Sequence, residues 1–360
     1  MTKVISIVGI VGIPASYGGF ETLAENLIKF HYGNPQGDDL YVFCSSVAYR
    51  ASERKDSFLS ARLKYLPISA NGALSTLYDT VSLLWAVLLK SDVILVLGVS
   101  GALIFPLIKI ISKARIIVNV DGVEWRRSKW KGFAKLFLRF SERVAVRFSD
   151  VVIADNLEIE RYLREQYRGQ FSVIAYGGDH AIAAEACTEC PLDLPERYGL
   201  TICRIEPENN VEMIISAFLV NANIQFVAIG NWNGSAYGRG LRRKYGTFPN
   251  IHLVDPIYDI GVLRFIRARA SVYVHGHSAG GTNPSLVEMM HFGVPVLAFD
   301  CAFNRATTEN NAMYFKSASH LGDLLCSEQW LNDGKKMTEI ARRSYTWSVI
   351  AEQYFSLFHG

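Results

Sequence analysis

Short apolar runs rich in β-branched residues alternate with longer stretches of helical periodicity along this chain, and the alternation occurs twice. Runs of this kind are typical of parallel strands whose sheet is covered by helices on both faces. The pattern therefore predicts an α/β fold with two doubly wound parallel sheets. The predicted strands span residues 4–8, 40–44, 63–66, 93–97, 116–120, 151–154 and 172–174 in the first half, and residues 200–203, 225–229, 251–254, 272–274 and 294–298 in the second.

The two series of strands predict two Rossmann-like domains, because 360 residues are more than one hydrophobic core usually organises. We expect an N-terminal domain over residues 1–180 and a C-terminal domain over residues 198–345. A linker is expected over residues 181–197, where two prolines interrupt a weak pattern. The last helical stretch, residues 346–360, is expected to pack back on the N-terminal domain.

The most apolar region lies between residues 81 and 111 and approaches the length of a membrane span. Lys90, Ser91 and Asp92 interrupt this region, so a buried helix, a parallel strand and a second helix explain it better than a transmembrane segment. The chain opens on a short apolar run without the cleavage pattern of a secretory signal. We therefore expect a cytoplasmic protein.

The composition argues against wholesale nucleic-acid binding and against a disulfide framework. A formal net charge of +3 is too small for wholesale nucleic-acid binding, so any basic surface must be local. The six cysteines have no framework spacing, as expected for reduced thiols. Cys187 and Cys190 form the one C-x-x-C motif, but no second pair of ligands matches it, which favours free thiols over a zinc or redox site.

Ligands of open α/β sheets bind beyond the carboxyl ends of strands, where loops meet helix N-termini. The first such loop spans residues 9–21, and its Gly18 and Gly19 can aim backbone amides at an anion. The spacing of its glycines is not that of a dinucleotide-binding fingerprint, which disfavours NAD. A tight turn without a ligand is the alternative.

The second loop begins at Arg204, directly after the first strand of the second half. An arginine in this position can pair with a diphosphate through two parallel hydrogen bonds. A surface ion pair with Glu206 or Glu208 is an equally good interpretation of this residue taken alone.

The third loop lies between the strand at 272–274 and a helix that contains Glu288. Its glycines and Thr282 can present amides to a phosphate, and the Glu288 carboxylate can accept hydrogen bonds from sugar hydroxyls. His275 and His277 suggest a metal, but no acidic or cysteine partner lies at ligand spacing, so no metal is expected.

Together these loops resemble the retaining glycosyltransferase family 4 of the GT-B fold, and within it a bacterial group assigned as surface-polysaccharide rhamnosyltransferases. The resemblance covers nearly the whole chain. Its marks are residues 9–15 with 17–21, 119–125, 175–178, 203–210, and 280–285 through Glu288.

The resemblance implies two Rossmann-like domains facing a cleft, a nucleotide-diphosphate sugar held by the C-terminal domain, and no cofactor. Arg204 matches the family's diphosphate-binding arginine and Glu288 the second of its two glutamates. The family lysine falls on Asn209 and the first glutamate on Gly280, changes that suit a 6-deoxyhexose or mark impaired catalysis. The implied donor-binding residues are Gly18, Gly19, Arg204, Asn209, Gly280, Gly281, Thr282, Asn283, Ser285 and Glu288.

The family's chemistry proceeds with retention and without a protein nucleophile, so the protein supplies positioning and stabilises the departing diphosphate. Arg204, Glu288 and Asp121 are the implied catalytic residues. Asp121 would orient the acceptor, because relatives often carry a cleft-facing histidine there, and capping of the turn at Asp121 and Gly122 is the alternative.

The resemblance implies transfer of a hexose or 6-deoxyhexose, with L-rhamnose from dTDP-rhamnose as the best interpretation, to a lipid-linked oligosaccharide of an O-antigen or capsule. A UDP- or GDP-sugar donor and a non-catalytic nucleotide-sugar-binding protein are the alternatives. A hydrolysing epimerase is disfavoured, because it would need acid and base carboxylates where Gly280 stands.

Residues 126–140 are basic and aromatic at helical spacing. Such a stretch suits an anionic membrane surface, where a lipid-linked acceptor would reside, and predicts peripheral attachment to the inner face of the cell membrane. A solvated helix whose apolar face packs on the core is the alternative.

Overall fold

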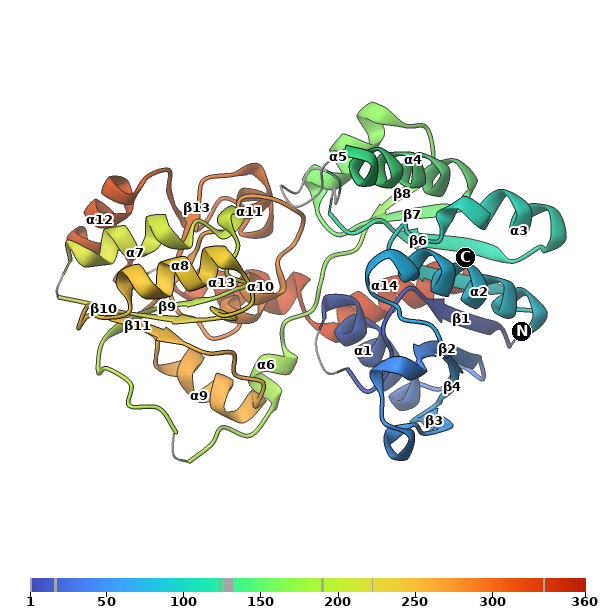
Figure 1. The fold of residues 1–360 in the computed structure, drawn as a ribbon, viewed down its shortest axis with the longest axis horizontal. Coiled ribbons are helices and arrows are strands. Elements are labelled where there is room, and N and C mark those ends of the chain that lie inside the picture. The colour runs from blue at the N-terminus through green and yellow to red at the C-terminus, as the bar shows by residue number, and fades with distance from the viewer. Residues whose placement is uncertain are drawn as a thin grey trace. The chain divides into compact units, whose positions relative to one another are not determined.

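The computed structural model describes residues 2–15, 18–122, 125, 132–188, 191–221, 223–332 and 334–360. The chain forms two compact units, one made of Met1–Ala175 with Trp347–Gly360 and the other of Tyr176–Thr346. Each unit has one central sheet with helices on its faces (Figure 1).

The sheet of the first unit has eight strands, which pair in parallel except at one edge. The antiparallel edge pair is β3 with β4, and β5 lies at the centre with all five residues buried. Burial on both faces explains why β5 is a continuous apolar run rather than an alternating one. In spatial order the strands are β3 (Ser57–Phe58), β4 (Ala61–Leu66), β2 (Asp39–Ser45), β1 (Val4–Val8), β5 (Val93–Leu97), β6 (Arg115–Asn119), β7 (Val151–Ala154) and β8 (Phe171–Val173).

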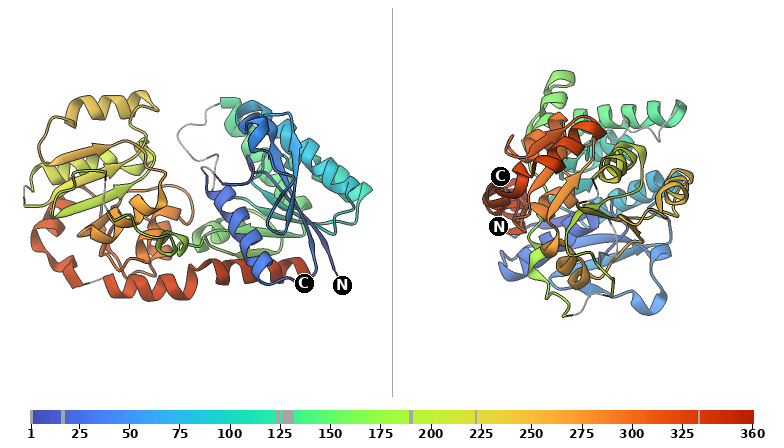
Figure 2. Two further views of the ribbon diagram at one scale, coloured as in Figure 1. Left: turned by 90° about the horizontal axis from the view of Figure 1, so that it is seen from below. Right: turned by 90° about the vertical axis from the view of Figure 1, so that its left-hand side faces the viewer.

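The helices of this unit divide between the two faces of its sheet. After β4 the chain adds the strands β5, β6, β7 and β8, each one further toward the same edge of the sheet. Because such connections are right-handed, their helices all lie on the same face of the sheet. The helices α2, α3 and α4 contact one another in that order, whereas α1 contacts α14 (Figures 1 and 2). The helices are α1 (Gly19–Gly33), α2 (Ser75–Leu88), α3 (Phe105–Ile111), α4 (Gly132–Phe148), α5 (Leu157–Gln166) and α14 (Trp347–His359).

The second unit has a six-stranded sheet in which every neighbouring pair is parallel. In spatial order its strands are β11 (Ile251–Val254), β10 (Gln225–Ile229), β9 (Tyr198–Ile202), β12 (Val272–His275), β13 (Val296–Phe299) and β14 (Met313–Phe315). Its helices are α6 (His180–Ala183), α7 (Val211–Leu219), α8 (Ala236–Tyr245), α9 (Ile260–Arg269), α10 (Pro284–Met290), α11 (Ala302–Thr307), α12 (Ala318–Ser327) and α13 (Gly334–Ser344).

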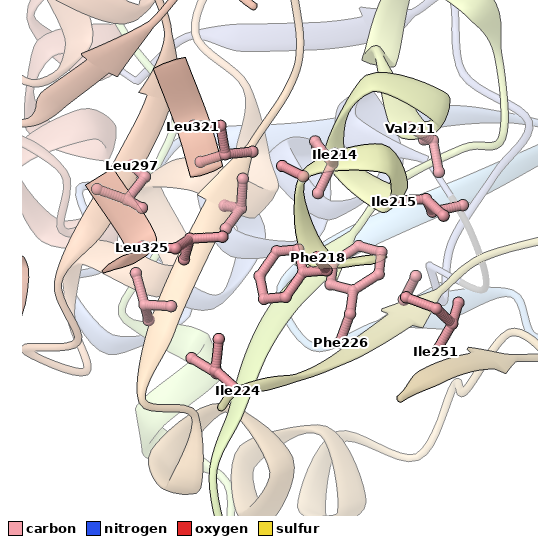
Figure 3. Packing of buried hydrophobic residues seen from close by; sticks show 14 of the residues in the cluster. Val211, Ile214, Ile215, Phe218, Ile224, Phe226, Ile251, Leu297, Leu321 and Leu325 are labelled. Atoms are coloured by element: carbon pink, nitrogen blue, oxygen red, sulfur yellow. The ribbon is translucent and has the colours of Figure 1, made fainter. Parts of the chain in front are cut away.

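The core of the second unit fixes the position of α7. The rings of Phe218 on α7 and Phe226 on β10 stack with centroids 4.6 Å apart, and both side chains are fully buried (Figure 3). A Cβ on Gly199 of β9 would collide with the Phe218 ring, so glycine is what lets the helix pack this closely. Burial of each phenylalanine stabilises the fold by about 1.5–3 kcal/mol. The loop that leads into α7 is therefore held against a rigid support.

All twelve predicted strands are confirmed, and the structure adds two short edge strands, β3 and β14. The structure differs at residues 181–197, the segment expected as a linker. This segment begins within α6, which contacts α9 and α10, and it groups with the second unit. The reason is local packing: Ala181 is buried, and a Cβ on Gly178 would collide with the backbone of α10.

The apolar region between residues 81 and 111 folds as most of α2, then β5, a short 3-10 helix (Ala102–Ile104) and α3. In the part of the chain that the structure describes, no helix is long and apolar enough to span a bilayer.

Candidate functional site

Two loops of the second unit meet at one edge of its sheet. The strands β9 and β12 are parallel neighbours, paired at Gly199 and Val272, so their carboxyl ends lie side by side. The loop after β9 begins with Cys203 and Arg204, and the loop after β12 begins with Gly276. This edge is where open α/β sheets bind their ligands.

Arg204 lies at the exposed side of this edge. Its side chain is 44% exposed, and its guanidinium lies 3.9 Å from the Glu206 carboxylate. An exposed pair at this distance contributes little to stability, because water screens it and both side chains lose rotamer freedom. The Arg204 cation therefore has little to lose on turning toward an anionic ligand.

Asn209 links the two loops and is almost completely buried. Its Nδ2 donates to the Arg204 carbonyl at 2.6 Å, and its Oδ1 lies 2.7 Å from Nδ1 of His277. Since an amide oxygen accepts, the proton of this pair lies on His277 Nδ1. In the structure the Asn209 amide, which the sequence predicts to bind the donor, contacts the Arg204 carbonyl and His277.

Further hydrogen bonds join the same loops. Asn210 Nδ2 donates to the Gly276 carbonyl at 2.8 Å, and Ser278 donates through both its amide and its hydroxyl to the Glu208 carbonyl. A Cβ on Gly276 would collide with the Asn209 carbonyl oxygen, so glycine is required for this approach. The two loops consequently behave as one folded piece that carries Arg204.

The two histidines at the end of β12, His275 and His277, are buried among protein groups. Burial, and next the neighbouring His277, lower the pKa of His275 well below its usual value, so this ring is neutral at physiological pH. Among the described residues, no three His, Cys, Asp or Glu side chains are grouped in a way that could hold a metal ion.

The glycine-rich segment before α10 has the geometry of a helix entry. Gly280 has a φ of +108°, in the region that side-chain-bearing residues rarely adopt. Asn283 caps α10 by accepting from the Ser285 amide at 3.0 Å, and Thr282 is buried. A glutamate in place of Gly280 would strain this backbone, which gives a local reason why the family's first glutamate is missing here.

Glu288 on α10 sits in a buried ion cluster. One of its oxygens pairs with the guanidinium of Arg267, a buried residue of α9, and the other lies 3.3 Å from Nε2 of His180 on α6. Burial alone would raise the pKa of Glu288, but Arg267 first and then His180 outweigh it and hold the pKa below its usual value. The carboxylate is thus kept ionised and fixed in direction.

Sequence reasoning missed Arg267 and His180. The motif at residues 175–178 was recognised without a role, and the structure supplies one. Gly178 packs against the backbone of α10, and its amide donates to the Tyr345 carbonyl at 2.7 Å. This contact sets the start of α6 and so brings His180 to Glu288. The sequence signal for Arg267 was weak, because α9 carries three arginines and only the structure shows that Arg267 is the buried one.

The glycine-rich loop of the first unit is tied to its own helix. The Glu21 carboxylate accepts from the Val11 amide at 2.8 Å, and Glu25 accepts from the Ala15 amide at 2.7 Å. Gly18 precedes α1 with a φ of +131°, and a Cβ on it would collide with the Glu21 carboxylate. The Glu21 carboxylate thus lies close to Gly18 on the side where a side chain would point.

Asp121 follows β6 in a turn of positive φ, +61°. Its amide donates to Oδ1 of Asn119 at 3.0 Å, and Nδ2 of Asn119 donates to the Tyr354 hydroxyl at 2.8 Å. Asp121, Gly18 and Gly19 thus belong to the first unit, whereas the other predicted site residues belong to the second.

Within the predicted membrane-binding stretch, residues 126–140, the segment 126–131 with four of its cations lies outside the described residues. Trp125 is described, and its indole N–H donates to the Glu142 carboxylate of α4 at 3.1 Å. Lys135 and Arg139 lie over the same ring. Trp125 thus contacts α4 rather than standing apart from the protein.

The comparisons with known proteins agree with this architecture. Residues 2–179 match the family "Domain of unknown function (DUF1972)", and residues 191–347 match "Glycosyl transferases group 1". No curated protein matches the chain by sequence.

Solved structures resemble the whole chain. Sucrose-phosphate synthase from Thermosynechococcus elongatus has a TM-score of 0.82 at 17% identity, with 99% of this chain and 98% of that chain covered. An E. coli trehalose-6-phosphate protein bound with UDP-2-fluoro glucose has a TM-score of 0.73 at 11% identity, covering 99% of each chain. A glycosyltransferase from Rickettsia africae has a TM-score of 0.72 at 10% identity, covering 99% of this chain and 98% of that one.

At these identities the likeness establishes the fold, which is the GT-B fold of two parallel-sheet α/β domains. The part of this fold that carries Arg204 and Glu288 is a glycosyl transferases group 1 domain. Fold and domain content are therefore those of a glycosyltransferase.

Proposed function

We propose that this protein transfers a sugar from a nucleotide-diphosphate donor to an acceptor with retention of anomeric configuration, and that the second unit binds the donor. The observation that carries the proposal is that one group 1 domain contains both an exposed arginine, Arg204, and a carboxylate held in one direction, Glu288. Arg204 lies at the carboxyl edge of the sheet. Glu288 lies on α10, the helix that follows the glycine-rich segment, and it is kept ionised by Arg267 of α9.

These two residues suit different parts of a donor. A guanidinium can neutralise the charge that grows on a departing diphosphate, and the amides near Gly280 and Gly281 can add hydrogen bonds to it. A carboxylate held in one direction can accept hydrogen bonds from sugar hydroxyls. Asp121 of the first unit is our candidate for orienting the acceptor.

We infer that the donor sugar is a 6-deoxyhexose, with L-rhamnose from dTDP-rhamnose as the specific proposal. Gly280 offers no carboxylate where relatives carry a glutamate, and Asn209 offers no cation where they carry a lysine. A site with fewer hydrogen-bond acceptors for the sugar matches a sugar that has one hydroxyl fewer. A UDP- or GDP-sugar is the competing donor.

For the acceptor we propose a lipid-linked oligosaccharide of a bacterial surface polysaccharide, an O-antigen or a capsule, reached at the inner face of the cell membrane. The support is the basic and aromatic composition of residues 126–140. Cations near an anionic bilayer contribute about 1 kcal/mol each to binding.

A panel of dTDP-, UDP- and GDP-sugars tests the proposal, with binding followed by calorimetry and turnover by release of the nucleoside diphosphate. We expect one donor class to bind and to turn over, and we expect dTDP-rhamnose to lead. Binding without turnover would instead indicate a non-catalytic nucleotide-sugar-binding protein.

Arg204→Ala tests the central residue, and Arg239→Ala on the exposed side of α8 is its matched control. Because the diphosphate charge grows in the transition state, Arg204→Ala should lower turnover by roughly a hundredfold while Arg239→Ala leaves it unchanged. Near-normal turnover of a folded Arg204→Ala variant would contradict the assignment.

A further inference from the structure

The helices α2, α3 and α4 form one layer over the first sheet (Figure 1). Their outer surface carries many exposed large hydrophobic side chains. We call this the α2–α4 surface. Its most exposed members are Ile110 of α3 at 82%, Phe133 of α4 at 81% and Leu88 of α2 at 79%. The exposed large hydrophobic residues of the surface are Leu77, Leu88, Leu103, Leu107, Ile110, Ile111, Phe133, Leu136 and Phe140.

The first half of α4 exposes large apolar side chains. Phe133, Leu136 and Phe140 are exposed and spaced as one helical stripe, whereas the buried residues of the helix are Ser141, Glu142, Ala145 and Val146. Packing of an apolar face on the core therefore does not account for Phe133, Leu136 and Phe140.

Charge on the same three helices is mostly positive. They carry the cations Lys109, Lys135, Arg139, Arg143 and Arg147, of which Lys109 pairs with the partly exposed Asp150 that follows α4. Their two acidic residues, Asp79 and Glu142, are both buried. The outward faces of these described helices thus present apolar and positive side chains without an acidic one.

The buried acids are held inside by protein donors. Asp79 accepts from the Ser100 hydroxyl. Glu142 accepts from the hydroxyls of Tyr162 at 2.7 Å and Tyr167 at 2.8 Å, besides the indole of Trp125. Neither carboxylate is available to neutralise the cations outside.

We propose that the α2–α4 surface docks on an anionic lipid bilayer, with the three helices lying in the plane of the membrane interface. Its apolar side chains enter the boundary between headgroups and acyl chains, and its cations meet lipid phosphates. The proposal rests on the proposed function only for the location of the acceptor, since the surface itself needs no assumption about the donor.

A second copy of the chain fits this surface poorly. A two-fold symmetric contact places the same patch on both sides, so the cations of α4 would face one another with no exposed acid of these helices to pair with. An anionic bilayer satisfies both features at once, because it offers phosphates to the cations and hydrocarbon to the apolar stripe.

The test is co-sedimentation of the full chain with phosphatidylcholine vesicles and with vesicles that also contain phosphatidylglycerol. The apolar variant is Ile110→Ser with Phe133→Ser and Leu136→Ser. The matched control is Tyr258→Ser with Ile260→Ser, which removes apolar side chains of similar exposure from the second unit. Thermal unfolding checks that both variants are folded.

We expect the chain to bind the anionic vesicles and the apolar variant to bind about tenfold or more weakly, because buried methylenes drive interfacial binding. The control should bind as the unchanged chain does. Arg143→Gln with Arg147→Gln should weaken binding to anionic vesicles and reduce its salt dependence.

Two results would overturn the proposal. One is equal vesicle binding by the unchanged chain and the apolar variant. The other is a dimer of the unchanged chain that the apolar variant converts to a monomer in sedimentation velocity, which would assign the surface to a second copy. Nucleotide-sugar turnover measured without vesicles reports on the proposed function separately, and the apolar variant should retain it.

Discussion

The two units of this protein treat buried carboxylates in opposite ways. In the second unit, Arg267 and His180 hold the Glu288 carboxylate ionised at the helix that follows a glycine-rich loop. In the first unit, burial raises the pKa values of Glu21 and Asp79, which are held by a backbone amide and a hydroxyl.

The contrast separates a carboxylate arranged to act as an anion from carboxylates that hold the fold together. A buried charge is costly unless a counter-charge faces it, so the presence of Arg267 marks Glu288 as a group whose charge is used. Glu21 instead ties residues 9–15 to α1. This difference supports donor binding in the second unit rather than at the glycines of the first.

The largest expected effect belongs to Glu288→Gln. The substitution keeps the shape of the side chain but leaves the Arg267 cation buried without its counter-charge, which should lower the free energy of unfolding by about 3–5 kcal/mol. Urea unfolding measures it. The double variant Glu288→Leu with Arg267→Leu should be less destabilised than the single one, and a loss below about 1 kcal/mol in the single variant would break the comparison.

Asp79→Asn should raise the free energy of unfolding, whereas Glu288→Gln should lower it. Burial raises the pKa of Asp79 to about 7, whereas the unfolded chain releases this proton near pH 4. The folded state therefore binds the extra proton in this window, and the free energy of unfolding falls as pH rises from about 4 to about 7.

Removing the titration should stabilise the protein at pH 8 by up to about 4 kcal/mol and flatten that slope. Thermal unfolding across pH 4 to 8 checks both effects. An unchanged slope in Asp79→Asn would show that Asp79 ionises freely in the folded protein. The stabilisation from Glu288 has the opposite pH dependence. Because the pKa of Glu288 is lowered in the folded protein, its contribution to the free energy of unfolding is lost as pH falls below about 4.

Asn209→Ala sharpens the account of the second unit. It removes the link between the Arg204 carbonyl and His277, and unpaired buried polar groups should cost about 1–3 kcal/mol. Donor affinity should fall as well, because the link positions the loop of Arg204. Donor affinity that stays normal while stability falls would limit Asn209 to a structural role.

The smallest effect is expected for Glu21→Gln. Glutamine can still accept from the Val11 amide, and it removes a charge that burial disfavours, so stability at pH 7 should change by less than about 1 kcal/mol. Urea unfolding run beside Glu288→Gln gives the direct contrast. Equal losses in the two variants would mean that the units do not differ in the way described.

Much of the fold could be predicted because parallel strands buried on both faces are continuous apolar runs, as in β5. The two missed strands are short edge strands: β3 has two residues and β14 has three, too few to establish a period. The grouping of residues 181–197 with the second unit could not be found from the sequence, because the burial of Ala181 depends on tertiary packing.

The site was predictable in part. Arg204 and Glu288 were found from a family resemblance and from their place after strands. Arg267 and His180 could not be found, because their pairing with Glu288 depends on how α6 packs on α9 and α10. Donor binding by Asn209 came from the family resemblance and stays a prediction, and its buried link to His277 could not be found from the sequence because it depends on how the two loops pack.

Donor binding by the second unit can be tested by hydrogen exchange of backbone amides with and without a saturating nucleotide sugar from the donor panel. We expect protection to rise most at residues 204–210 and 275–283 of the second unit. Protection confined to residues 9–15 of the first unit, with the second unit unchanged, would contradict it.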